Sequence, residues 1–137
     1  MDDDAGDREL IEAEFSRDGF VFRAVKDGLE AMDYLEGEGK FANRKEFPVP
    51  DVILLDLKMP TVDGFEFLKW RRLASDNICA IPVVVVSAFG SPEQVTRAYK
   101  LGANGFMAKP VQFGTFQKHL KAMGIFWSEL MVTPSIA

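Results

Sequence analysis

The sequence has few of the residues that build disulfide frameworks and metal centres, because its 137 residues include one cysteine and one histidine. A single cysteine excludes a disulfide within the chain, and the apolar neighbours of Cys79 favour a small buried side chain over a reactive thiol. His119 stands alone on an amphipathic segment, so solvent exposure or core packing is a better interpretation than metal ligation.

Long apolar runs and a basic charge are also lacking. The longest apolar run, around residues 81–89, is too short to cross a bilayer, so no membrane span is predicted. The first residues, MDDDAGDRE, are acidic where a secretory signal needs a basic start, which favours a cytoplasmic location. The net charge is −5 and the basic residues are scattered, which argues against nucleic-acid binding. One globular domain with a sizeable core remains.

Strand and helix patterns alternate along this domain. Runs of apolar and β-branched residues predict strands at 20–25, at 51–57, within 81–89 with an end near Ser87, and at 105–110. Amphipathic spacing predicts helices at 4–18, 28–36, 65–74, 91–101 and 113–123. The segment 37–50 is predicted as a long loop, and 124–137 shows no clear period. Such alternation predicts an α/β fold, a doubly wound parallel sheet with helices on both faces.

Polar residues stand where three successive predicted strands end. They are Asp56, Ser87 and Lys109. Ligands of doubly wound sheets bind outside the carboxyl ends of the strands, so these side chains are candidates for one site. The lysine can meet a phosphate, and the serine hydroxyl can donate to another phosphate oxygen.

An acidic run, Asp2-Asp3-Asp4, precedes the first predicted helix and is the second part of the candidate site. Carboxylates that share a pocket with Asp56 repel one another unless a cation neutralises them. Mg²⁺ prefers oxygen ligands and is typically held by one or two carboxylates plus a phosphate. A strand-end carboxylate can attack phosphorus when a metal ion and a lysine stabilise the developing charge. The sequence therefore predicts that Asp56 accepts a phosphoryl group.

Four motifs resemble the response-regulator receiver domain of two-component signalling, over nearly the whole chain. DDDAGDRELI is similar to the acidic start of the first helix of that family, and LLDLKMPTVDG to its phosphoacceptor loop. VVVVSAF resembles the strand with the conformational hydroxyl, and LGANGFMAKPV the segment with the switch aromatic residue and the lysine. The resemblance implies a flavodoxin-like receiver fold.

The same resemblance implies roles for individual residues. Asp56 would be the phosphorylation site, with Lys109 and Ser87 completing the catalytic set. Ser87 and Phe106 would form the switch pair, although Phe106 is equally compatible with a simple core position. The implied Mg²⁺ ligands are Asp3, Asp56 and the backbone carbonyl of Lys58, with Asp2 acting through water.

A narrower resemblance concerns the loop GEGKFANRKEFPVPD and the motif IFWSEL. Both are similar to small stand-alone receivers that partner phytochrome-like sensor kinases. The predicted organisation is a receiver domain at 1–123 and an aromatic tail at 124–137, which is too short for an output domain. A sensor histidine kinase is the expected partner. The downstream target is undetermined, and the resemblance allows a homodimer through the fourth helix and neighbouring strand or through the tail.

One element of the family pattern is missing: the apolar first strand that leads into the acidic run. That strand normally lies inside the sheet, so its loss would leave two neighbours with unpaired backbone groups. Three explanations compete, of which the first is preferred: a preceding strand lies outside the given chain, a partner chain fills the gap, or the chain starts downstream and the domain is impaired.

Two other functions compete with a phosphorylation switch. A Mg²⁺-dependent phosphatase of the haloacid-dehalogenase type also uses a strand-end aspartate, but it carries Asp-x-Asp where this chain reads Asp56-Leu57-Lys58. A receiver-like scaffold that is not phosphorylated would bind partners through its surface. The preferred interpretation is a signalling phosphoacceptor that catalyses only its own phosphorylation and dephosphorylation.

Overall fold

The computed structural model describes residues 21–58, 62–88, 90–109, 112–125 and 129–133. Within these ranges the strands are β1 (Val21–Ala24), β2 (Val52–Asp56), β3 (Val83–Ser87), β4 (Gly105–Ala108) and β5 (Glu129–Val132). The helices are α2 (Gly28–Glu36), α3 (Gly64–Leu73), α4 (Asp76–Cys79), α5 (Pro92–Lys100) and α6 (Phe113–Ala122), with a 3-10 turn η1 (Gly39–Phe41). The helix predicted at 4–18 lies outside the described residues.

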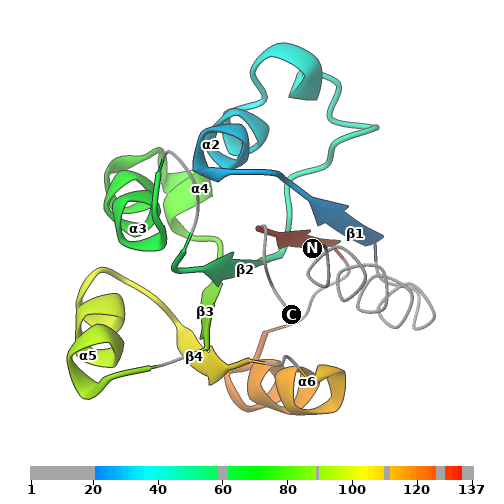
Figure 1. Cartoon of the computed structure of the whole chain (residues 1–137). Coiled ribbons are helices and arrows are strands. Elements are labelled where there is room, and N and C mark those ends of the chain that lie inside the picture. The colour runs from blue at the N-terminus through cyan, green and yellow to red at the C-terminus, as the bar shows by residue number, and fades with distance from the viewer. Residues whose placement is uncertain (1–20, 59–61, 89, 110–111, 126–128, 134–137) are drawn as a thin grey trace, which may run out of the picture.

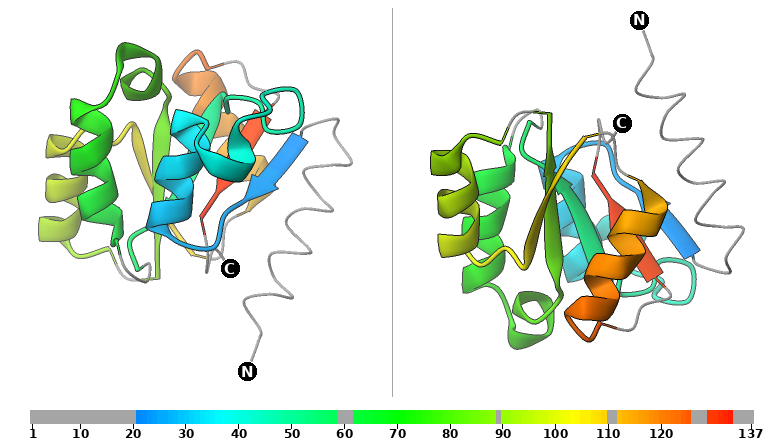
Figure 2. Two further views of the ribbon diagram at one scale, coloured as in Figure 1. Left: turned by 90° about the horizontal axis from the view of Figure 1, so that it is seen from above. Right: turned by 90° about the horizontal axis from the view of Figure 1, so that it is seen from below.

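The strands form one parallel sheet in the order β1-β5-β2-β3-β4 (Figure 1). Helices α2, α3 and α5 cover one face and α6 covers the other, as the two views of Figure 2 also show. This arrangement confirms the predicted doubly wound α/β fold. None of the described helices has the length and apolar character that a bilayer span requires.

The interior strand β2 explains why the sheet carries a core on each face. Every residue of β2 is buried. Because side chains alternate along a strand, Ile53 and Leu55 pack in the core under α2 and α3, while Val52 and Leu54 pack under α6. The continuous apolar run is thus the expected pattern of a strand covered on both sides.

Strand β5 occupies an interior position between β1 and β2, although it comes from the C-terminal segment. Glu129 is in register with Val21, and Leu130 is in register with both Phe22 and Val52. The sequence shows no clear period in this segment, and the missing first strand predicts an unfilled gap inside the sheet. In the structure a strand of the same chain lies between β1 and β2, an arrangement that none of the three proposed explanations included.

Polar residues cap the helices that follow the strands at the carboxyl edge of the sheet, which is the side where the parallel strands end. The carboxylates of Asp27 and Asp63 accept from the third residue of α2 and α3, at 2.8 Å in both cases. Ser91 caps α5 in a capping box with Gln94. Gly37 ends α2 with φ 70°, a conformation that favours glycine.

The predicted loop 37–50 is held against α2 by aromatic and cationic contacts. The ring centroids of Tyr34 and Phe41 lie 5.0 Å apart, and those of Phe41 and Phe47 5.1 Å apart. The Arg44 guanidinium donates to the carbonyls of Tyr34 and Leu35, at 2.6 and 2.7 Å. This arginine therefore satisfies carbonyls at the C-terminus of α2, where a helix leaves them without internal partners.

Candidate functional site

The three residues predicted from strand ends meet at the carboxyl edge of the sheet. Asp56 ends β2, Ser87 ends β3, and Lys109 follows β4 directly. Asp56 is in register with Val86, and Ser87 is in register with Ala108. Parallel strands end at the same edge, so the topology alone brings the three side chains to one place.

Asp56 is a buried carboxylate whose two oxygens are both engaged. Its exposed fraction is 2%. The Lys109 ammonium forms an ion pair with Oδ2, and the Lys58 backbone N–H donates to Oδ1 at 2.8 Å. A buried charge is stable only when it is paired and hydrogen-bonded, which is the situation here. The contact between Asp56 and Lys109 places an acid and an ammonium group at one point, as predicted.

Lys109 reaches Asp56 from the neighbouring pair of strands. Its backbone N–H donates to the carbonyl of Ser87 at 3.0 Å, which extends the ladder of β3 and β4 by one residue. Its side chain is 17% exposed, so the ammonium is partly shielded from water. Ser87 is half-buried at the end of β3. The backbone hydrogen bond between β3 and β4 thus fixes the position of Lys109 relative to Ser87 independently of their side chains.

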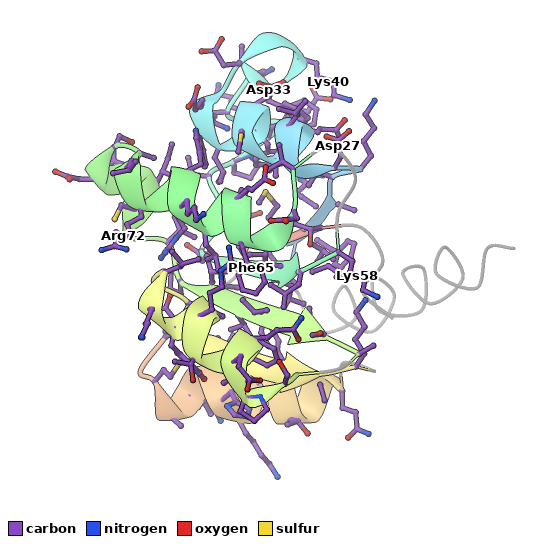
Figure 3. All side chains as sticks on the ribbon, turned by 60° about the vertical axis from the view of Figure 1, so that its left-hand side comes forward. Asp27, Asp33, Lys40, Lys58, Phe65 and Arg72 are labelled. Atoms are coloured by element: carbon purple, nitrogen blue, oxygen red, sulfur yellow. The ribbon has the colours of Figure 1, made fainter. Side chains whose placement is uncertain are left out.

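Lys58 lies two residues after Asp56 and is exposed. Figure 3 shows its side chain at the end of the sheet toward which the strands point. Its backbone N–H, not its ammonium group, makes the contact with Asp56. This contact is a turn closed by the aspartate side chain two residues earlier, which is a common local use of Asp.

Gly64 allows the loop after Asp56 to return closely to the strand. Its N–H donates to the carbonyl of Leu57 at 3.0 Å. A Cβ at this position would lie 2.7 Å from the Leu57 Cα and 2.8 Å from the Asp56 carbonyl oxygen, closer than atoms of this kind approach. The sequence analysis did not single out Gly64. Its only signal was the Asp-Gly pair before a helix.

Thr133 is the second residue at this edge that the sequence analysis missed. It is fully buried, and its hydroxyl oxygen accepts from the Asp56 backbone N–H at 2.7 Å. The same hydroxyl donates to the carbonyl of Leu54 at 3.1 Å. No local motif marks Thr133, because its partners are 77 and 79 residues away in the chain.

Phe106, the predicted switch aromatic, is half-buried on β4 in register with Val85. Its ring packs where Gly90 has no side chain, since a Cβ at Gly90 would lie 2.7 Å from the Phe106 Cε1. Phe106 therefore borders both the partly exposed surface and the core under α5. This position leaves both interpretations of the residue, switch and core, open.

The predicted metal ligands are only partly within the described residues. Asp2 and Asp3 lie outside them. Among the residues that the structure describes, no group of three or more His, Cys, Asp or Glu side chains forms a metal site. Asp56 and the Lys58 carbonyl supply oxygen donors of the kind Mg²⁺ prefers, but one carboxylate alone is a weak site. The described residues thus fit part of a magnesium site, and further acidic groups are needed to complete it.

With this geometry established, comparison with known proteins identifies the class. Residues 1–121 match the family model described as the response regulator receiver domain. The chain therefore belongs to that family, which confirms the resemblance drawn from its motifs.

Several particular proteins are similar to it. It is 33% identical to the probable methanogenesis regulatory protein FilR2 of Methanothrix harundinacea, over 93% of this chain and 80% of that protein. It is 30% identical to sporulation initiation phosphotransferase F of Bacillus subtilis, over 88% and 87% of the two chains.

Solved structures of phytochrome response regulators are also similar. The bacteriophytochrome response regulator RtBRR has a TM-score of 0.73 and 41% identity, over 91% of this chain and 75% of that one. The Mn²⁺-bound form of response regulator Rcp1 has a TM-score of 0.66 and 28% identity, over 90% and 87% of the two chains. These neighbours agree with the narrower resemblance to phytochrome-associated receivers.

Proposed function

We propose that this chain is a two-component response regulator that accepts a phosphoryl group on Asp56 from a sensor histidine kinase. The single observation that carries the proposal is the buried Asp56 carboxylate held between the Lys109 ammonium and the Lys58 N–H. Membership of the receiver family supports it. A structure of the cyanobacterial phytochrome response regulator RcpA, 36% identical over 75% of this chain and 71% of that one with a TM-score of 0.59, is described as phosphorylated.

In the proposed reaction an oxygen of Asp56 attacks the phosphorus of a phosphohistidine. The new O–P bond forms as the N–P bond of the donor breaks, and the electron pair of that bond leaves with the imidazole. The product is an acyl phosphate. Lys109 meets the charge on the transferred phosphoryl oxygens, and the Ser87 hydroxyl donates to another of them.

Mg²⁺ is the proposed cofactor. Asp56, the Lys58 carbonyl, Asp3 and, through water, Asp2 would hold it. When bound, the ion would neutralise charge on the phosphoryl oxygens. The Mn²⁺-bound structure of Rcp1 supports a divalent ion in a receiver of this kind.

The proposed consequence of phosphorylation is a changed contact surface around Phe106, α5 and β4, to which a downstream protein or a second copy binds. Ser87 would turn toward the phosphoryl group, and Phe106, whose ring packs beside Gly90, would change its position in response. A cytoplasmic location, consistent with a kinase partner, and the receiver boundary at residue 123 stay predictions.

The test is incubation with a small phosphodonor, acetyl phosphate, and Mg²⁺, followed by intact mass and hydroxylamine treatment. We expect one phosphoryl group that hydroxylamine removes, as an acyl phosphate requires. Asp56→Asn should abolish it. Asp63→Asn is the matched control, because it removes a carboxylate from the same loop while asparagine still caps α3.

Other outcomes would replace the proposal. Continuous release of phosphate with no accumulating adduct would indicate the phosphatase alternative. A folded chain that takes no phosphoryl group from the small donor or from a histidine kinase would indicate the scaffold.

A further inference from the structure

The end of strand β5 makes a side-chain contact with the backbone of the acceptor residue. Thr133 directly follows β5, is 0% exposed, and joins β5 to β2 through three hydrogen bonds. Its N–H and its hydroxyl donate to the Leu54 carbonyl, both at 3.1 Å, and its hydroxyl oxygen accepts from the Asp56 N–H at 2.7 Å.

The strand register explains why this contact falls on Asp56. Val132 pairs with Leu54, and the Thr133 N–H continues the ladder by one bond. In a regular parallel ladder the next N–H of β2, that of Asp56, would be directed to the main chain of β5. Here the Thr133 hydroxyl oxygen accepts the hydrogen bond from the Asp56 N–H, so a side-chain contact replaces the next bond of the ladder.

This hydroxyl therefore helps to hold the acceptor in place. The Asp56 side chain is tied to the Lys58 N–H and the Lys109 ammonium, while its main chain is tied to Thr133. A reacting group must be held within a fraction of an ångström of its productive position. Thr133→Val would take away the hydroxyl oxygen that accepts from the buried Asp56 N–H, and we expect the end of β2 to shift in response.

We propose that Thr133 is a positioning residue for the acceptor, through which the C-terminal strand β5 sets the rate at which Asp56 is phosphorylated. The inference rests on the proposed function. It adds a role for the segment 129–133, which the motifs of the acceptor site do not include.

The experiment compares the full chain with Thr133→Val, which keeps the shape but removes the hydroxyl, and Thr133→Ser, which keeps the hydroxyl. Phosphorylation by acetyl phosphate is followed by intact mass across donor concentrations, and rates are corrected for the folded fraction. We expect Thr133→Val to lower the maximal rate about tenfold at an unchanged half-saturating donor concentration, and Thr133→Ser to restore most of it.

A structural control separates positioning from loss of stability. Leu130→Val weakens the packing of β5 in the core under α6 without touching the Thr133 hydroxyl. Leu130→Val should keep the wild-type maximal rate per folded molecule. If Thr133→Val does not fold, Thr133→Ala replaces it, since the smaller side chain also lacks the hydroxyl.

The outcomes are distinguishable. A folded wild-type chain that forms no Asp56 adduct with acetyl phosphate or with a histidine kinase overturns the proposed function and this inference with it. A wild-type chain that forms the adduct, together with a Thr133→Val chain that forms it at the same maximal rate, overturns the inference alone. Equal slowing by Leu130→Val and Thr133→Val would also overturn it, because stability would then explain both.

Discussion

The two edges of the sheet differ in how well their charged groups are matched. At the carboxyl edge both oxygens of Asp56 have partners, and its backbone N–H has Thr133. At the amino edge, where Glu129 begins β5, the buried Glu129 Oε2 has no hydrogen-bond partner among the described residues, and neither has the Nε of Arg23 on β1. Strand β5 connects the two situations, since Glu129 begins it and Thr133 follows it.

The difference shows that polar contacts are more complete around Asp56 than around Glu129. At the amino edge, burial raises the pKa of Glu129, the charge of Asp51 adds to this, and Arg23 opposes it. The backbone there is nevertheless satisfied, because Glu129 N donates to Asp51 Oδ2 at 3.0 Å. A charge kept in a buried place needs partners. In the part of the chain that the structure describes, each oxygen of Asp56 has one, whereas Glu129 Oε2 has none. That matching is what a fixed, reactive carboxylate requires.

The largest expected effect on stability comes from removing the cation that pairs with Asp56 at the carboxyl edge. Lys109→Met leaves a carboxylate whose side chain is only 3% exposed without its cation. We expect the free energy of unfolding at neutral pH to fall by about 4 kcal/mol, the usual range when one partner of a buried pair is removed. Denaturant titration measures the loss.

The double variant Asp56→Asn/Lys109→Met is the control for this effect. It removes both charges, so it should regain most of the stability that Lys109→Met loses, with a coupling energy of at least about 1 kcal/mol. Additive losses from the two single changes would contradict the matching argument, because they would show that neither charge depends on the other.

Strand β2 is more predictable from the sequence than strand β5, although both lie inside the sheet. A continuous apolar run predicts strand β2, and its last residue is the proposed acceptor, Asp56. Strand β5 has only four residues and follows aromatic residues without a clear period. Its structure depends on pairing with β1 and β2, whose residues are distant in the chain. Such non-local pairing leaves little local pattern, so the sequence of the tail does not predict a strand.

The candidate site shows the same division. Asp56, Ser87 and Lys109 were predicted because parallel strands end at one edge. Thr133 was not predicted, since its contact joins residues 77 positions apart. Gly64 was missed because close backbone approach is visible only once the loop is folded. The acidic residues before the first predicted helix lie outside the described residues, so their part in the site stays a prediction.

A second prediction tests whether β5 is as integral to the sheet as β2. Leu130 and Leu54 are both fully buried and pack in the same core. We expect Leu130→Ala and Leu54→Ala each to lower the free energy of unfolding by about 3 kcal/mol, as buried leucines do when truncated. Denaturant titrations of the two variants give the comparison. A loss below about 1 kcal/mol for Leu130→Ala alone would mean that β5 is only loosely attached.

The smallest expected effect lies at the amino edge and depends on pH. A carboxyl group whose pKa is higher in the folded than in the unfolded chain binds more protons when folded, so stability falls as pH rises through the window from its ordinary value, 4.5, to the raised one. Glu129→Gln removes this titration. We expect the variant to match the wild type near pH 4 and to exceed it by less than about 1 kcal/mol at pH 7.

Thermal or denaturant unfolding of both chains at each pH provides the measurement, and the difference between the chains cancels the titration of their common groups. Glu46→Gln, at an exposed loop position, controls for the loss of one negative charge from a chain of net charge −5. If Glu129→Gln is instead less stable than the wild type at pH 7, the attraction between Glu129 and Arg23 outweighs the burial of the carboxylate. Glu129 would then be stabilised by the charge of Arg23 without a direct hydrogen bond. The two edges would differ only in the number of hydrogen bonds that their carboxylates accept.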